Sequence, residues 1–174
     1  NFKDANGNIV PVPDGVITVI TYEGLERIGF NDSTTDELFD SLYEILNQGG
    51  EDERPKSEKQ KAGFREKLET ILGRGLSGTM VNIEDLAIDF FAYDEAHKMK
   101  KVFTAVKGEV TEDEKGKSTR GKNPYVINSG VPSTIGLKGF MLNYYIQEKN
   151  KGQNVVLLTA TPFTNSPLEI FSML

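Results

Sequence analysis

Two short apolar runs, each followed at once by polar residues, constrain the fold of this chain most. The run D-F-F-A-Y at 89–93 ends in two acids, and V-V-L-L at 155–158 ends in T-A-T-P. A third run, V-I-T-V-I-T at 16–21, is β-branched and suits a buried strand. A short helix is expected at 22–28, directly after the V-I-T-V-I-T run. Apolar residues at helical spacing predict a longer helix at 133–150, before the V-V-L-L run. Strands that alternate with helices predict an α/β fold with a mostly parallel sheet, whose ligands lie beyond the carboxyl ends of the strands.

The segments between these runs predict helices and loops. Apolar residues at helical spacing after the cap-like Ser33 and Thr34 predict a helical hairpin over about 33–74: Leu38, Leu42, Ile45, Leu46, Phe64, Leu68, Ile71 and Leu72. Its charged connector, 49–59, and a polar loop over about 107–124 are expected to be flexible. A helix is expected to begin at Glu95, and another at Ser166-Pro167-Leu168-Glu169.

Composition limits the class of protein. With 174 residues, 37% of them hydrophobic, the chain is expected to form one domain over 1–174. No apolar run is long enough to span a bilayer, and cysteine is absent, so disulfides and thiolate metal sites are excluded and a cytoplasmic location is expected. The formal net charge is −6, but eight basic and four acidic residues between Lys98 and Lys122 give that stretch +4. A solvated loop explains this stretch better than a nucleic-acid surface.

The acids that follow 89–93 suggest nucleotide chemistry. Hydrolysis of a nucleotide needs a divalent metal on the phosphates and a group that orients or deprotonates water. Asp94 could address magnesium while Glu95 faces the γ-phosphate. A second reading treats D-E-A-H as an acid-rich helix start, with His97, the one histidine, as a packing or capping residue. A metal hydrolase built on Asp94, Glu95 and His97 is a third, less favoured reading because no further ligands cluster nearby in the sequence.

The order of the motifs resembles the superfamily 2 helicases and translocases. V-I-T-V-I-T-Y-E-G-L, D-F-F-A-Y-D-E-A-H and V-V-L-L-T-A-T-P-F-T-N-S-P-L-E-I-F-S-M-L look like corresponding motifs of the Swi/Snf-type ATPases. The block from Glu84 to His97, continued by Lys98, Lys100 and Val102, resembles the large methylase-helicase proteins of phages and conjugative elements. The similarity covers roughly 16–174 and implies a three-layer RecA-like domain that is incomplete.

The resemblance also implies roles for single residues. Asp94 would hold Mg²⁺, Glu95 would be the catalytic base for ATP hydrolysis, and His97 with Thr159 and Thr161 would couple the nucleotide state to DNA contact. Two further residues, Thr21 and Tyr22, would lie near the DNA backbone. Double-stranded DNA and the remaining domains of a longer parent chain are the implied partners, and no membrane partner is expected.

One expected motif is missing from the sequence. A phosphate-binding loop reads G-x-x-x-x-G-K-[ST], and no segment here fits it. Gly116-Lys117-Ser118 has Thr111 where the motif requires its first glycine. Residues 116–122 have the glycines and the lysine at the right spacing, but Asn123 stands in place of the Ser or Thr, and Pro124 follows. The turn-rich start without Met suggests an internal piece of a longer chain. We therefore expect an inactive part of an ATPase, or alternatively a complete binding module on a degenerate ATPase fold.

Overall fold

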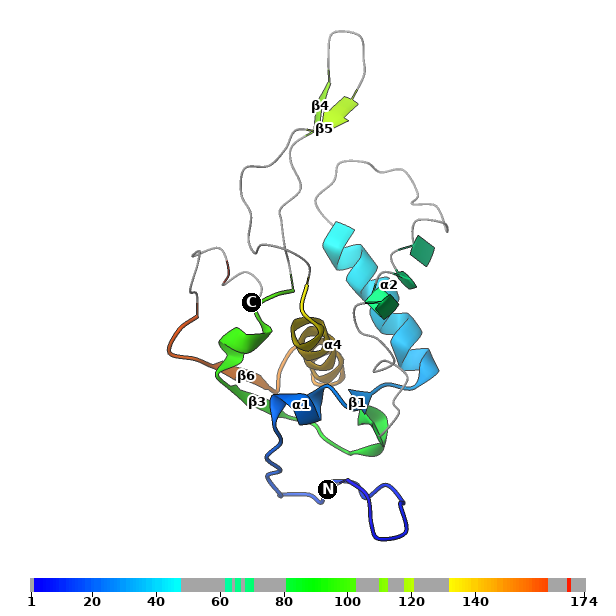
Figure 1. Ribbon diagram of the computed structural model, residues 1–174, viewed down its shortest axis with the longest axis vertical. Coiled ribbons are helices and arrows are strands. Elements are labelled where there is room, and N and C mark those ends of the chain that lie inside the picture. The colour runs from blue at the N-terminus through cyan, green and yellow to red at the C-terminus, as the bar shows by residue number, and fades with distance from the viewer. Residues whose placement is uncertain are drawn as a thin grey trace.

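The computed structural model describes residues 2–47, 81–102 and 132–162 continuously, together with 62–63, 65–66, 68–70, 110–112, 118–120 and 169. Within these ranges, helices and short parallel strands alternate, so the predicted α/β class is confirmed. Figure 1 shows the long helix α4 (Thr134–Lys149) at the centre, with the strands β3 and β6 beside it.

The sheet nearest α4 consists of two parallel strands. β3 (Phe91–Asp94) pairs with β6 (Val155–Leu158), with Phe91 opposite Val155 and Asp94 opposite Leu158. Both strands were predicted from their apolar runs, although β3 begins two residues later than 89. Parallel pairing brings the carboxyl ends of β3 and β6 to one edge, as the sequence predicted.

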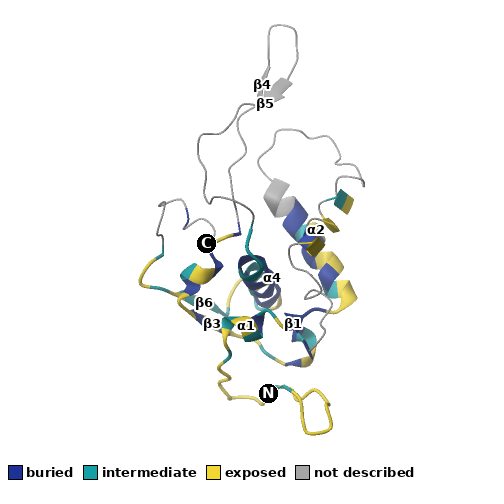
Figure 2. Cartoon of the chain, viewed as in Figure 1, coloured by how far each residue is buried: buried dark blue, intermediate teal, exposed yellow. Residues whose placement is uncertain are grey.

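Only one face of this sheet is covered by described residues. Phe91 and Tyr93 on β3 are buried in the core, and Val155 and Leu157 on β6 pack against it. On the opposite face Val156 and Leu158 are 39% and 52% exposed. α4 contributes the largest share of the core, which contains Leu137, Met141, Leu142, Tyr145 and Ile146 (Figure 2).

α4 was predicted over 133–150 and is confirmed. Ser133 caps it, because its side-chain oxygen accepts a hydrogen bond of 3.1 Å from the backbone N–H of Gly136. The helix packs against η3 (Ala96–Met99), the 3-10 turn that follows the D-E dipeptide. A Cβ at Gly136 would lie 2.8 Å from the carbonyl oxygen of Lys101 and 2.9 Å from that of Met99, so glycine is required for this approach.

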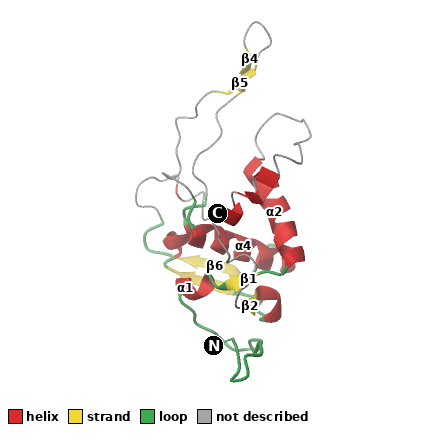
Figure 3. Cartoon of the chain, turned by 45° about the vertical axis from the view of Figure 1, so that its right-hand side comes forward, coloured by secondary structure: helices red, strands yellow, loops and turns green. Residues whose placement is uncertain are grey.

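A second pair of parallel strands, β1 and β2, lies near β6 on the same side of α4 (Figure 3). α1 (Tyr22–Leu25) leads to β1 (Ile28–Gly29), then to α2 (Asp32–Asn47), and β1 pairs with β2 (Val81–Asn82) before the 3-10 turn η2 (Ile83–Asp85). Figure 3 shows α2 beside α4, in agreement with their contacts. The two-residue strands β1 and β2 were not predicted.

The predicted strand at 16–21 is wrong. Residues 16–20 form no strand, and Ile17 and Val19 are 91% and 90% exposed. A β-branched run favours a pleated, half-buried surface and becomes a strand only beside a neighbour. Among the described residues no strand lies beside this run, and Thr21 at its end caps α1 instead.

The observed helices begin or end at other residues than the sequence predicts. α2 begins at Asp32, and the side chain of Asn31, rather than Ser33 or Thr34, caps it by accepting a 2.8 Å hydrogen bond from the Thr34 N–H. The helix expected from Glu95 is the short turn η3. Described residues at 62–63, 65–66 and 68–70 are helical, as the hairpin predicts.

The region predicted as a polar loop over 107–124 contains a small antiparallel ribbon. β4 (Val110–Glu112) pairs with β5 (Ser118–Arg120), and Figure 1 shows the ribbon standing apart from α4. The connector 49–59, Phe64, Ile71, Leu72 and the helix start at Ser166–Leu168 lie outside the described residues. In the described part of the chain, none of the helices combines the length and the hydropathy that a membrane span requires.

Candidate active site

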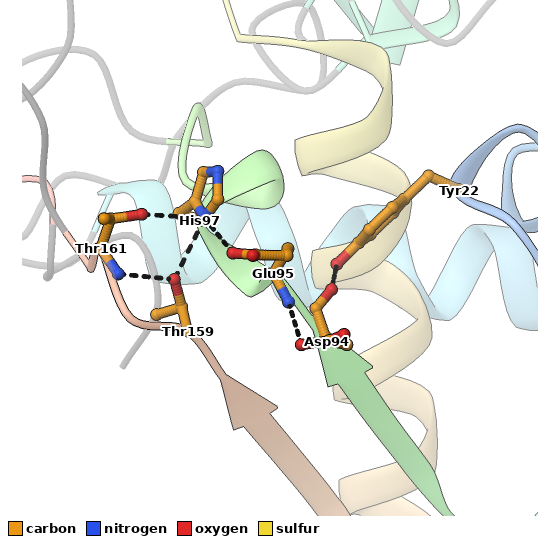
Figure 4. A network of polar contacts seen from close by, with 6 residues as sticks. All are labelled: Tyr22, Asp94, Glu95, His97, Thr159 and Thr161. Carbon is orange, nitrogen blue, oxygen red and sulfur yellow. Dashed lines mark hydrogen bonds and ion pairs between the residues drawn. The ribbon is translucent and has the colours of Figure 1, made fainter.

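The acidic pair lies at the carboxyl end of β3, where the chain leaves the sheet. Asp94 is the last residue of the strand, and Glu95 follows in a left-handed conformation, with φ 56° and ψ 45°. This conformation is unfavourable for a residue with a Cβ and turns the backbone sharply. The two carboxylates therefore point in different directions, as Figure 4 shows. The separate tasks that the sequence suggests for Asp94 and Glu95 require such a divergence.

Asp94 is fixed through its backbone and one of its carboxylate oxygens. Its Oδ1 accepts a 3.0 Å hydrogen bond from the N–H of Glu95, and its backbone carbonyl accepts a 2.7 Å hydrogen bond from the Tyr22 hydroxyl. The side chain is exposed, and no described residue donates a hydrogen bond to Oδ2. One oxygen is thus held while the other faces solvent.

His97 joins the two motifs. Its Nδ1 lies 3.0 Å from Thr159 Oγ1, 3.3 Å from Thr161 Oγ1 and 3.1 Å from Glu95 Oε2 (Figure 4). An ionised carboxylate only accepts hydrogen bonds, so with Glu95 ionised Nδ1 carries the hydrogen that these three oxygens share. The imidazole is 26% exposed and the Glu95 side chain 51% exposed, which leaves the carboxylate accessible from solvent.

The threonines form a compact turn directly after β6. Thr159 Oγ1 accepts a 3.1 Å hydrogen bond from the backbone N–H of Thr161, which curls the chain so that both hydroxyls face one imidazole nitrogen. The structure thus brings together Glu95, His97, Thr159 and Thr161, four of the residues singled out from the sequence.

Tyr22 approaches this site from α1. Its hydroxyl donates the hydrogen bond to the Asp94 carbonyl. The Nζ of Lys98 lies over its ring, 5.3 Å from the ring centroid, in a cation–π contact. Burial raises the pKa of the Tyr22 hydroxyl, and the neighbouring carboxylates of Asp94 and Glu95 raise it further. Tyr22 therefore remains a hydrogen-bond donor at neutral pH.

Thr21 is placed differently from Tyr22. Its Oγ1 accepts a 3.1 Å hydrogen bond from the Gly24 N–H and caps α1. The pKa of the adjacent Glu23 is lowered by its own backbone N–H and by the Thr21 side chain. Thr21 is exposed, but its hydroxyl is already used to hold the turn that presents Tyr22.

Sequence reasoning missed one contact at this site. Lys100 Nζ lies 2.8 Å from Glu169 Oε2, and both residues are buried. In the sequence, Lys100 appears only as a continuation of the D-E-A-H block, and Glu169 only as the third residue after an expected helix cap. The sequence gives no direct signal that these two residues form a pair. It shows only that a lysine follows the D-E-A-H motif and that a glutamate follows the T-A-T motif.

The donor set around Asp94 suits magnesium better than zinc. Mg²⁺ keeps several waters and takes one or two carboxylates together with phosphate oxygens, and an exposed carboxylate with an open oxygen is a ligand of that kind. Zinc sites need three or four protein ligands. In the described ranges no group of three or more histidine, cysteine or acidic residues is arranged to hold a metal ion.

Comparison with known proteins gives a distant relative. The chain is 27% identical over 177 residues to the "Defense against restriction protein B" of Escherichia phage P1, and the match covers 98% of this chain but 7% of that protein. No protein-family model matches the chain. No solved structure matches it either. The relative is a phage protein, which agrees with the resemblance to proteins of phages and mobile elements, and this chain corresponds to a small part of its length.

Proposed function

We propose that this chain forms part of the first RecA-like domain of an ATP-dependent DNA helicase or translocase of superfamily 2. In this proposal it supplies the metal-binding and water-activating carboxylates, and the phosphate-binding loop and the second domain come from other parts of a longer protein. The whole enzyme would act on double-stranded DNA, and the 174 residues alone would be inactive.

One observation carries the proposal. The His97 Nδ1 contact to Thr159 Oγ1, at 3.0 Å, joins the D-E-A-H and T-A-T motifs, which lie 62 residues apart. Both motifs leave the carboxyl ends of paired parallel strands, the usual place for ligands in an open α/β sheet. An acid-rich helix start with a packing histidine would explain neither the pairing nor the three oxygens around one nitrogen.

Each residue has a defined task in this proposal. Asp94 would hold Mg²⁺ through its open carboxylate oxygen, and the metal would neutralise charge on the nucleotide phosphates. Glu95, turned away from Asp94 by its left-handed backbone, would accept the proton of the attacking water. If the Glu95 carboxylate moved, its contact with His97 Nδ1 would be lost. The same nitrogen contacts Thr159 in the turn after β6, so the movement would be transmitted to that turn.

The test is a pair of amide substitutions in the longer protein that contains this chain. Glu95→Gln keeps shape but cannot accept the proton, so steady-state ATP hydrolysis should fall by about 10² or more while ATP affinity stays nearly unchanged. Asp94→Asn removes a metal-facing charge, so it should weaken Mg²⁺-dependent nucleotide binding as well as turnover. Nucleotide titration and single-turnover hydrolysis separate the two effects.

A matched control is Glu37→Gln, an exposed glutamate on α2 away from the acidic pair, which should leave both measurements unchanged. Hydrolysis by Glu95→Gln at the parent rate would remove the catalytic assignment. The isolated 174 residues should show no saturable binding of Mg²⁺ and ATP in calorimetry, because a lone carboxylate pair repels a polyanion without a lysine and amide cradle. Micromolar binding by the chain alone would contradict this division of the site.

A further inference from the structure

A buried ion pair connects the two halves of the candidate site. Lys100 follows η3, the turn that carries His97, and Glu169 follows the turn that carries Thr159 and Thr161. Their side chains meet at 2.8 Å across 69 residues of sequence. The side chains are 11% exposed for Lys100 and 1% exposed for Glu169.

The burial of this pair makes stability a poor explanation for it. Removing two charges from water costs several kcal/mol for each ion, roughly offset by their attraction, so a buried pair adds little net stability over apolar residues of the same size. What a buried pair adds is geometry, because an ammonium and a carboxylate must meet at a fixed distance to offset their lost hydration. The pair therefore fixes the position of one segment relative to the other.

The pair joins the residue that follows η3 to a residue that lies beyond the threonine turn in the sequence, and η3 and that turn must meet at His97. Nδ1 reaches Thr159 Oγ1 at 3.0 Å and Thr161 Oγ1 at 3.3 Å only while η3 and the turn after β6 stay close. On the η3 side, Lys100 lies three residues beyond His97, about one turn of the 3-10 helix away, and its N–H donates to the His97 carbonyl. A displacement at Lys100 is thus transmitted to His97 over a very short stretch of backbone.

We propose that Lys100 and Glu169 are positioning residues that hold His97 against the threonine turn. The inference rests on the proposed function of His97, Thr159 and Thr161 as the link between the two motifs. Neither Lys100 nor Glu169 touches the nucleotide in this view. They act through His97, and their loss leaves the acidic pair of β3 in place but uncouples it from the turn after β6.

The experiment uses the single histidine of this chain as its reporter. With the histidine labelled with ¹⁵N, long-range ¹H–¹⁵N spectra of the 174-residue chain give one pair of ring-nitrogen signals. Thr159→Ala defines the signal of an imidazole released from the turn. Lys100→Met and Glu169→Gln should each move the Nδ1 signal most of the way to that reference, and their effects should not add in the double variant, since each removes the contact between Lys100 and Glu169.

The matched control is Lys101→Met, the same substitution at the exposed neighbouring lysine, which should leave both ring signals at their wild-type positions. Wild-type signals in folded Lys100→Met or Glu169→Gln would overturn the proposal. Circular dichroism and thermal unfolding establish that each variant is folded. If a single change prevents folding by leaving one charge buried, the double variant Lys100→Met/Glu169→Met removes both charges and is expected to fold.

In that double variant the Nδ1 signal should still be displaced, because two apolar side chains impose no fixed distance between the segments. A wild-type signal there would equally overturn the proposal. The spectra contain no nucleotide and no DNA, so their outcome is separate from that of the Glu95→Gln hydrolysis assay. Full hydrolysis by Glu95→Gln would remove the catalytic assignment and leave the positioning result standing, and the reverse also holds.

Discussion

The ammonium of Lys138 donates a 2.7 Å hydrogen bond to the backbone carbonyl of Ile28 and has no exposed surface. Its Nζ also lies 5.5 Å from the centre of the Phe30 ring. This contact joins the middle of α4 to β1 across the core. Burial lowers the pKa of Lys138 to about 8, and the nearby Glu26 carboxylate opposes that shift only in part.

The lowered pKa predicts a stability that rises with pH. Below the folded pKa the lysine is charged in both states, and between that value and its ordinary pKa only the unfolded chain binds the proton. The penalty of burying the charge is therefore present at neutral pH and is lost as pH rises, and the free energy of unfolding should increase by about 2 kcal/mol between about pH 7 and about pH 9.5. Urea unfolding at the two pH values measures it. Lys138→Met should abolish this increment, and an equal increment in that variant would assign it to other groups.

Tyr22→Phe tests the bond between α1 and the end of β3. Removal of the hydroxyl deletes the 2.7 Å hydrogen bond to the Asp94 carbonyl but keeps the ring under Lys98, so the chain should lose about 1 kcal/mol of stability. Tyr144→Phe is the matched control, since no hydrogen bond of that hydroxyl appears among the described residues. Denaturant unfolding of both variants gives the comparison, and equal losses would mean that the bond to Asp94 does not matter.

Two glycines on α4 should respond differently to alanine. At Gly136 the new Cβ would meet the carbonyl oxygens of Lys101 and Met99, which are backbone atoms, so Gly136→Ala should destabilise the chain by about 1–3 kcal/mol. At Gly139 the Cβ would meet the Met99 side chain, which can move. Because alanine also favours a helix over glycine by about 1 kcal/mol, Gly139→Ala should be nearly neutral. Thermal unfolding of the two variants ranks them, and the opposite order would contradict the packing of α4 on η3.

Tyr93→Phe should stabilise the chain or leave it unchanged. The Tyr93 hydroxyl is buried without a hydrogen-bond partner among the described residues, and burial raises its pKa strongly, with a smaller contribution from Tyr22. Phenylalanine keeps the ring contact with Phe91, at 5.5 Å between centroids, and removes the unsatisfied group. A gain of up to about 1 kcal/mol corresponds to roughly 2–4 °C in Tm. A clear loss of Tm would show that the hydroxyl has a partner.

The sequence predicted the parts of the fold that depend on local pattern. β3, β6 and α4 have apolar runs or helical spacing long enough to be recognised, and their boundaries agree within about two residues. The strands β1 and β2 could not be found in this way, because a strand of two residues shows no periodicity and its partner lies more than fifty residues away in the sequence. At 16–21 the pattern was strong but the neighbouring strand that it needs is not among the described residues.

The sequence identified the residues of the candidate site, but not the hydrogen bonds between them. Asp94, Glu95, His97, Thr159 and Thr161 follow from motifs at strand ends. Parallel pairing of the two strands then brings the last four of these together. That three oxygens surround one nitrogen of His97 depends on the left-handed turn at Glu95, which no spacing encodes. The Lys100–Glu169 pair depends on tertiary packing alone and was missed for that reason.

The left-handed backbone at Glu95 has a consequence for how this position varies among related chains. Folding alone would favour glycine or asparagine there, because both adopt positive φ at little energetic cost. For glutamate the same conformation is unfavourable. A glutamate retained across a family is therefore a mark of selection for its carboxylate. Under the proposed function, drift to glycine or asparagine in one lineage would identify proteins that have kept this architecture and lost the catalytic base.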